Sequence, residues 1–168
     1  MKKIMILVGL LFVAGICFGA DPVEGFWISF DDKSGKATAG WEIYTVGNKL
    51  FGKVLSVTGH PQDVTAYNCK DSYRGFPVQG NVSAMRVVGT PWIFDLTMKK
   101  QGEWSGGQVI DPDEGRMYGC EITFHPAGTK SGSKTFQQDT LEMRGKIGPF
   151  GRSQFWTKVT REQASALR

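Results

Sequence analysis

The chain has 168 residues, with 20 Lys and Arg against 16 Asp and Glu, and a formal net charge of +4 at pH 7. This length suits one domain with a substantial core. The basic residues are scattered along the sequence, which excludes the concentrated positive face that a nucleic-acid partner requires.

Residues 1–20 are predicted to be a cleaved secretory signal peptide. A basic start, "MKK", precedes the uncharged run "IMILVGLLFVAGICF" and the small residues "GA", which is the order found in such signals. A membrane anchor is the alternative, but a span needs about 20 apolar residues and no basic cluster follows this run. We therefore expect export to the periplasm or cell envelope with no transmembrane segment after processing. Acylation at Cys17, as in a lipoprotein, is a minor alternative.

Residues 21–160 are predicted to form a single all-β domain, followed by a short tail over residues 161–168. Eight runs alternate between apolar and polar residues with a period of two, which is typical of strands: "FWISF", "AGWEIYTV", "KLFGKVLSV", "PWIFDLTM", "EWSGGQVI", "RMYGCEITF", "TLEMRGKIG" and "RSQFWTKV". Gly, Asn, Asp and Pro separate most neighbours, as turns require. Since closure removes exposed edges, the pattern favours an eight-stranded antiparallel up-and-down β-barrel with one long loop, and a sandwich is the alternative.

Alternation also predicts which side chains line the barrel. The expected wall consists of five aromatic residues: Trp41, Trp92, Phe94, Tyr118 and Phe124. Arg144 is a candidate anchor for an anionic group. A barrel of eight strands is either filled by its side chains or holds one small ligand, and periodicity leaves that choice open.

The long loop over residues 59–81 interrupts the regular spacing of the strands. It is expected either to cover one end of the barrel or to pack on the outer wall, and three of its aromatic residues form a candidate contact surface for a partner: Tyr67, Tyr73 and Phe76. Cys69 of this loop and Cys120 are a candidate disulfide, because an exported protein meets an oxidising compartment. The alternative is that Cys120 is a small buried apolar residue.

No catalytic residue, metal site or cofactor is predicted. The acidic stretch "DPDEG" at residues 111–115 resembles a calcium loop, but the position that should carry the bidentate carboxylate is Ile122. We interpret the stretch as a hairpin turn, and "DDKSGK" near the start as a second turn of the same kind. His60 and His125 belong to no metal-binding pair, so an enzyme is not expected.

The start of the first strand, Gly25-x-Trp27, resembles the G-x-W opening of lipocalins and related calycin-like barrels. The resemblance implies that Trp27 closes one barrel end against a basic residue of the last strand, for which Arg152 and Lys158 are the candidates. Lys158 and Arg152 lie on one face of that strand by alternation.

Longer stretches resemble a family of small exported bacterial proteins, domain-of-unknown-function family 2147 (DUF2147). They are "GFWISFDDKSGKATAGWEIY", "GFPVQG", "WSGGQVIDPDEGRMYGCEI" and "LEMRGKIGPFGRSQFWTKV". The resemblance implies a lipocalin-like barrel in the envelope and no established activity. Members often carry C-x-x-C in the long loop, whereas Ser72 stands at the last place here, so a metal or redox role of that pair is not expected.

We therefore expect an exported, non-enzymatic binding protein for a small, mainly apolar or lipid-like ligand. The alternative is an envelope module with a filled barrel that contacts a protein partner through the long loop.

Overall fold

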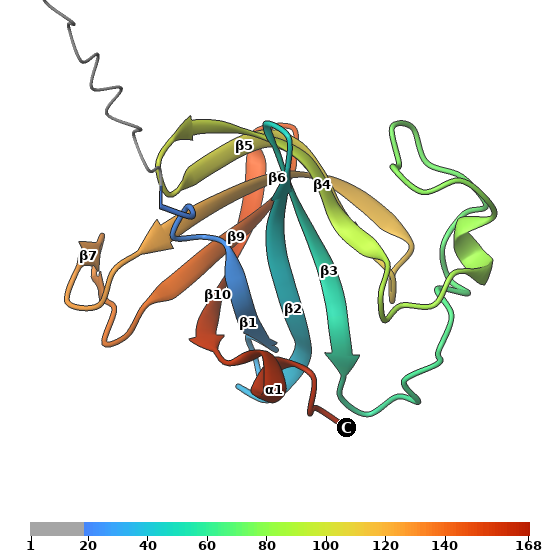
Figure 1. Cartoon of the computed structure of the whole chain (residues 1–168), viewed down its shortest axis with the longest axis horizontal. Coiled ribbons are helices and arrows are strands. Elements are labelled where there is room, and N and C mark those ends of the chain that lie inside the picture. The colour runs from blue at the N-terminus through green and yellow to red at the C-terminus, as the bar shows by residue number, and fades with distance from the viewer. Residues whose placement is uncertain (1–18) are drawn as a thin grey trace, which may run out of the picture.

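The computed structural model describes residues 19–168 (Figure 1). Cys17 and nearly all of the predicted signal peptide lie outside the described residues. Eight long antiparallel strands close into one barrel in the order β1-β10-β9-β6-β5-β4-β3-β2, which confirms the predicted barrel. These strands are β1 (Gly25–Phe30), β2 (Ala37–Val46), β3 (Lys49–Val57), β4 (Pro91–Lys100), β5 (Glu103–Asp111), β6 (Arg116–His125), β9 (Thr140–Ile147) and β10 (Phe150–Val159).

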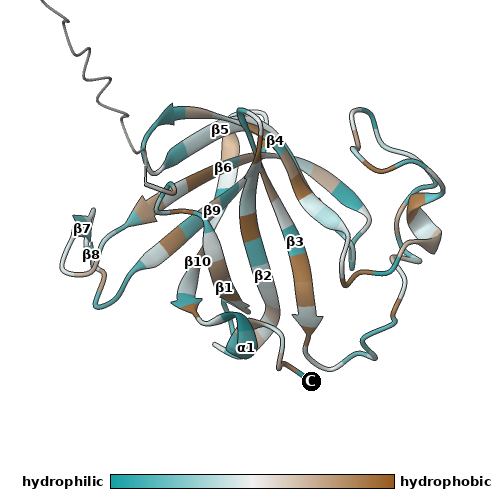
Figure 2. Cartoon of the chain, viewed as in Figure 1, coloured by the Kyte–Doolittle hydropathy of each residue, from teal (hydrophilic) through white to brown (hydrophobic). Residues whose placement is uncertain are grey.

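Four smaller elements lie in the connections and at the C-terminus. They are the 3-10 turn η1 (Val82–Ala84), the short strands β7 (Lys130–Ser131) and β8 (Lys134–Thr135), and helix α1 (Arg161–Ala164). Apolar and polar segments alternate along strands such as β2 and β3 (Figure 2), because successive side chains of a strand point to opposite faces. The lumen-facing side chains form one part of the buried core.

The up-and-down order places the connections at two opposite ends of the barrel. We call the end with the connections 31–36, 58–90, 112–115 and 148–149 the mouth. We call the other end, which holds the N-terminal segment and the connections 47–48, 101–102 and 126–139, the closed end.

Trp27 seals the closed end. Its side chain is fully buried, and its Nε1 donates a hydrogen bond to the Val23 carbonyl at 2.9 Å. The Lys158 ammonium lies 5.2 Å from the Trp27 ring centroid, and the Phe124 ring meets Trp27 edge-on at 6.3 Å between centroids. The basic residue of the last strand that contacts Trp27 is thus Lys158. Arg152 lies at the mouth instead, so its assignment as the closing residue is wrong.

Strand β4 departs from simple alternation at Asp95, whose φ of +67° marks an irregularity. Leu96 and Ile93 pair with β3 residues that are two apart and therefore share a face. They both face the lumen although they are three residues apart. Trp92 and Phe94, which flank Ile93, consequently face the outer wall. The prediction that these two aromatic residues line the interior is wrong, since it assumed an unbroken period of two.

The long connection packs on this outer wall, beside β4 (Figure 1). The Phe76 ring lies 5.8 Å from Trp92 and 5.5 Å from Phe94, centroid to centroid. The Tyr73 hydroxyl donates to the Gly115 carbonyl at 2.8 Å, which ties the loop to the β5–β6 turn. Of the predicted contact surface, only Tyr67 is strongly exposed, at 67%.

The C-terminal tail lies against the outer face of β2 and β3. The fully buried Ser56 hydroxyl donates to the Ala164 carbonyl at 2.6 Å. Gly40, which pairs with Ser56, leaves room for this carbonyl, because a Cβ on Gly40 would lie 1.7 Å from the Ala164 oxygen. Helix α1 is thereby fixed to the barrel (Figure 1).

Candidate functional site

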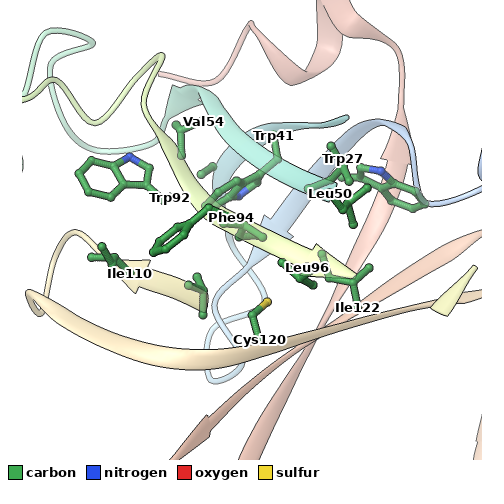
Figure 3. Close-up of a cluster of buried hydrophobic side chains, with 14 of the residues drawn as sticks. Trp27, Trp41, Leu50, Val54, Trp92, Phe94, Leu96, Ile110, Cys120 and Ile122 are labelled. Carbon is green, nitrogen blue, oxygen red and sulfur yellow. The ribbon is translucent and has the colours of Figure 1, made fainter. Parts of the chain in front are cut away.

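A cavity of about 650 Å³ occupies the mouth half of the barrel. The closed half of the lumen is filled by fully buried aliphatic side chains: Ile43, Leu50, Leu96, Ile122 and Leu141. Figure 3 shows part of this cluster, with Leu50, Leu96 and Ile122 on the side of Trp27. The barrel is therefore neither filled throughout nor hollow throughout.

Two stacked tryptophans line the cavity, and they come from β2 and β10, the strands on either side of β1. The rings of Trp41 on β2 and Trp156 on β10 lie 4.9 Å apart at an angle of 23°. Trp41 Nε1 donates to Ser29 Oγ at 3.1 Å, and Trp156 Nε1 donates to Gln154 Oε1 at 3.2 Å. Because both indole N–H groups have partners, the ring faces are left to provide an apolar surface.

Further apolar side chains complete the cavity wall. They come from β3, the long connection, β5 and β9: Val54, Val57, Val64, Val87, Val109 and Met143. Tyr118 on β6 lines the cavity towards the mouth and donates its hydroxyl hydrogen to Glu114 Oε2 at 2.8 Å. The interior of the cavity is thus mainly apolar and aromatic, and its charged groups gather at the mouth.

Two acidic turns of the same construction form part of the mouth. In the β1–β2 turn, Asp31 Oδ1 accepts hydrogen bonds from the backbone N–H and the hydroxyl of Ser34, both at 2.7 Å. In the β5–β6 turn, Asp111 Oδ1 accepts from the backbone N–H groups of Asp113 and Glu114. The bonds from backbone N–H groups are those that aspartate side chains make in turns. The interpretation of "DPDEG" as a hairpin turn is confirmed.

The backbone of the two turns also matches. The N–H of Gly35 donates to the Asp31 carbonyl, and that of Gly115 donates to the Asp111 carbonyl, each at 2.8 Å. Both glycines have positive φ, +69° and +65°, the left-handed conformation that glycine adopts without steric cost. The repeated sequence pattern therefore produces one loop geometry at two places on the mouth.

The two aspartates of these turns differ in their surroundings. Hydrogen bonds from the Ser34 hydroxyl and backbone hold the pKa of Asp31 below its ordinary value. Burial raises the pKa of Asp111, against the opposing effect of its backbone hydrogen bonds. Next to the first turn, Arg152 on β10 forms an ion pair with Asp32, with 2.7 Å between Nη2 and Oδ2.

The predicted ligand-binding residues are dispersed in the structure. Trp41 and Tyr118 line the cavity. Trp92 and Phe94 lie on the outer wall, and Phe124 packs on Trp27 at the closed end. Sequence reasoning missed Trp156 as a wall residue, although alternation places it on the face of its strand that carries Lys158. It also missed the role of the acidic turns in forming the mouth.

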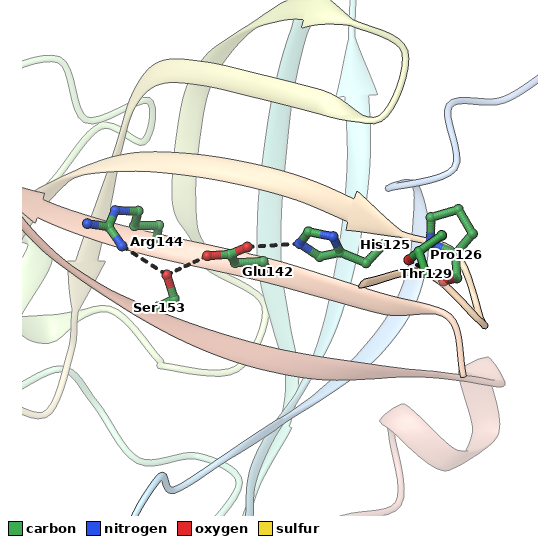
Figure 4. Close-up of polar contacts among 6 residues, drawn as sticks. All are labelled: His125, Pro126, Thr129, Glu142, Arg144 and Ser153. Carbon is green, nitrogen blue, oxygen red and sulfur yellow. Dashed lines mark hydrogen bonds and ion pairs between the residues drawn. The ribbon is translucent and has the colours of Figure 1, made fainter. Parts of the chain in front are cut away.

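Arg144, the predicted anion anchor, lies on the outer wall as well. It alternates with Met143, which lines the cavity, and its Nη1 donates to Ser153 Oγ at 3.2 Å. Ser153 donates to Glu142 Oε1, and Glu142 Oε2 is 2.8 Å from His125 Nε2 (Figure 4). The carboxylate stands between serine and histidine, so the imidazole does not reach the serine hydroxyl. These hydrogen bonds therefore lack the direct histidine–serine contact that activates a serine nucleophile.

The Glu142→Gln variant is expected to lose part of the pH dependence of stability. Burial alone would raise the pKa of Glu142, but hydrogen bonds from Ser153 and His125 outweigh burial and hold it below its ordinary value. A carboxylate with a lowered folded-state pKa stabilises the fold above its unfolded pKa, and this contribution disappears as pH falls through the folded-state pKa.

Urea unfolding between about pH 6 and pH 3 measures this effect. The wild type should lose stability more steeply over that range than Glu142→Gln. Glu103→Gln, which removes an exposed carboxylate paired with Lys100, is the control and should follow the wild type. If the free energy of unfolding falls equally steeply with pH in all three proteins, the assigned role of Glu142 is wrong.

The predicted Cys69–Cys120 disulfide is wrong in this structure, where both thiols are free and buried. Cys69 lies on the outer-wall loop, with its sulfur 4.0 Å from the Pro112 carbonyl. Cys120 lies in the middle of β6 opposite Gly145, which lines the lumen. The barrel wall thus separates the two side chains. Burial raises the pKa of both thiols, which disfavours the thiolate form that a nucleophile requires.

Within residues 19–168, His, Cys, Asp and Glu side chains form no group of three or more that could hold a metal ion. In the same range, every helix is too short or too polar to cross a membrane.

Comparison with known proteins agrees with this architecture. Among solved structures, the chain is similar to a protein described as "Protein HP1028 from the human pathogen Helicobacter pylori belongs to the lipocalin family", with a TM-score of 0.60, 14% sequence identity, and coverage of 83% of this chain and 84% of that chain. At this identity the likeness shows the fold alone. No curated protein matches. The family model "Uncharacterized protein conserved in bacteria (DUF2147)" matches residues 25–158. The chain therefore belongs to the DUF2147 family, and its barrel is lipocalin-like.

Proposed function

We propose that the protein binds a small, mainly apolar molecule in the cavity at the mouth of its barrel. The observation that carries this proposal is the cavity of about 650 Å³ above a filled, closed end, with the Trp41–Trp156 stack in its wall. Ligand pockets typically measure about 300–1,000 Å³ and are lined mainly by apolar and aromatic side chains with a few polar groups.

We further propose that the protein acts after export to the periplasm or cell envelope and that it is not an enzyme. The basic and apolar N-terminal sequence supports export. The raised pKa values of the two buried thiols and the order of the His125–Glu142–Ser153 hydrogen bonds argue against a cysteine or serine nucleophile at these positions. The alternative of a protein-interaction module draws less support, because Tyr73 and Phe76 are engaged within the molecule.

The Gly145→Leu variant tests the cavity directly. Gly145 faces the lumen, and a Cβ there would make only ordinary contact with Tyr118, at 3.8 Å. A leucine would therefore extend into the cavity and occupy ligand space. Gly119→Leu is the matched control, because Gly119 lies on the neighbouring strand β6 but faces outward, where a Cβ would meet Lys146 at 3.7 Å.

Native mass spectrometry of protein purified from its own host measures the result. The wild type and Gly119→Leu should retain a bound small molecule, and Gly145→Leu should lose at least about 90% of it, which corresponds to a tenfold weaker affinity or more. Circular dichroism confirms that both variants fold. If the wild type carries no small molecule and binds none of a set of apolar fluorescent probes, the binding proposal is wrong.

A further inference from the structure

The charges around the cavity are unbalanced. Five carboxylates line it, those of Asp31, Asp32, Asp111, Asp113 and Glu114. Two cationic side chains line it, Lys36 and Arg152, so the cavity wall has an excess of three negative charges when His60 is neutral. The molecule as a whole has the opposite sign, with a formal net charge of +4. The negative charge is therefore local to the mouth.

The acidic turns face each other across the opening. In the closed ring of eight strands, β1 and β5 are four places apart, which is the largest separation possible. The turns that follow these strands carry Asp31 and Asp111 and therefore lie on opposite sides of the mouth. A ligand leaving or entering the cavity passes between them.

These carboxylates keep free acceptor positions. The turn hydrogen bonds of Asp31 and Asp111 all go to Oδ1, which leaves Oδ2 of each residue available. Among the described residues, no Lys, Arg or His nitrogen lies within 4.0 Å of the carboxylate oxygens of Asp31, Asp111, Asp113 or Glu114. Only Asp32 is neutralised, and its partner Arg152 is thereby also engaged.

The side chains below the mouth can also contact a positively charged group. Aromatic rings of Trp41, Trp156 and Tyr118 border the space between the acidic turns and the filled core. Ring faces attract cations as well as apolar groups, and Trp is the strongest in this respect. An anionic head group would instead meet four unpaired carboxylates. Arg152 is already paired with Asp32, which leaves Lys36 as the lining cation without an ion pair among the described residues.

We propose that the ligand of this cavity is an amphiphile whose head group is a positively charged amine or ammonium. Its apolar part lies against the Trp41–Trp156 stack, and its head group lies at the mouth between Asp31 and Asp111. This inference rests on the proposed binding function and specifies the chemical class of its ligand.

Three probes with the same ten-carbon chain test the head-group preference: decyltrimethylammonium, decanol and decanoate, each below its micellar concentration. Titration calorimetry, with tryptophan fluorescence as a second readout, gives the affinities. We expect the ammonium probe to bind at least about fivefold more tightly than the alcohol and the carboxylate to bind most weakly. The preference should shrink as salt is raised, because salt screens charges at an open mouth.

The variants Asp31→Asn and Asp111→Asn, alone and combined, assign the preference to these residues. Asparagine keeps the Oδ1 acceptor, so it preserves the turn hydrogen bonds while removing the charge. The combined variant should bind the ammonium probe about fivefold more weakly than the wild type and bind the alcohol unchanged. Glu103→Gln removes a negative charge from the other end of β5 and should leave all three affinities unchanged.

The outcomes separate the two proposals. Binding of the alcohol with no preference for the ammonium probe would overturn the head-group inference and leave the cavity function standing. A preference for decanoate would overturn it in favour of an anionic ligand. Failure of all three probes to bind would contradict the binding function itself, and the head-group inference with it.

Discussion

Replacing Trp27 by alanine is expected to lower the free energy of unfolding by about 3–5 kcal/mol, the range for truncating a large buried aromatic side chain. Trp27 is fully buried. The change leaves a cavity at the closed end and removes the hydrogen bond to the Val23 carbonyl. It also removes the ring under the Lys158 ammonium and beside Phe124. Denaturant titration followed by circular dichroism measures the loss.

Two further variants separate closure from general effects of removing an aromatic residue. Phe150→Ala removes a ring that is 78% exposed at the mouth and should change stability by less than about 0.5 kcal/mol. Trp27→Phe keeps a ring but loses the N–H group. Its loss of unfolding free energy should be larger than that of Phe150→Ala and smaller than that of Trp27→Ala. Ligand affinity should survive Trp27→Ala at temperatures where the protein is folded, because the cavity lies at the other end. A loss below 1 kcal/mol for Trp27→Ala would contradict the assigned closure.

Replacing Gly40 by alanine is expected to lower the free energy of unfolding by about 1–3 kcal/mol and to release the C-terminal tail, as forcing extra volume into a packed site does. The added Cβ would lie 1.7 Å from the Ala164 carbonyl oxygen. Since that atom belongs to the backbone, the tail has to move as a unit. The buried Ser56 hydroxyl then loses its acceptor. Denaturant titration measures the cost, and limited proteolysis followed by mass spectrometry detects the released tail.

A chain that ends at Thr160 provides the decisive control. In that background the clash is absent, so Gly40→Ala should be neutral or slightly stabilising, because glycine weakens a strand relative to alanine. The difference between its effects in the full-length and shortened chains is the coupling energy between Gly40 and the tail. Equal destabilisation in both chains would show that the cost comes from the strand and not from the tail.

The sequence predicted the strands well because their signal is local. A period of two and the turn residues between the runs depend only on neighbours along the chain, and they indicated eight strands and a closed barrel. The same local reasoning identified the β5–β6 turn and the repeated turn chemistry at Asp31 and Asp111. Trp27 could be connected with a barrel end only through its resemblance to the lipocalin opening.

The candidate site was harder to predict because strand register and barrel closure decide which residues line it. One irregular residue, Asp95, reverses the facing of Trp92 and Phe94 in β4. Arg144 was predicted to bind a ligand, but it lies beside a lumen-facing residue and so points outward. An oxidising compartment would allow Cys69 and Cys120 to form a disulfide, but the barrel wall lies between them.

The amino-acid sequence by itself determined the all-β character of this protein, the number of its barrel strands and the chemistry of its turns, since each depends on interactions within a few residues. Only the tertiary structure decided which aromatic rings line the lumen, where the filled core gives way to a cavity, and that two acidic turns far apart in the chain face each other across the mouth. These properties depend on the order and register in which eight strands pair around a ring, and no short segment of the sequence contains that information.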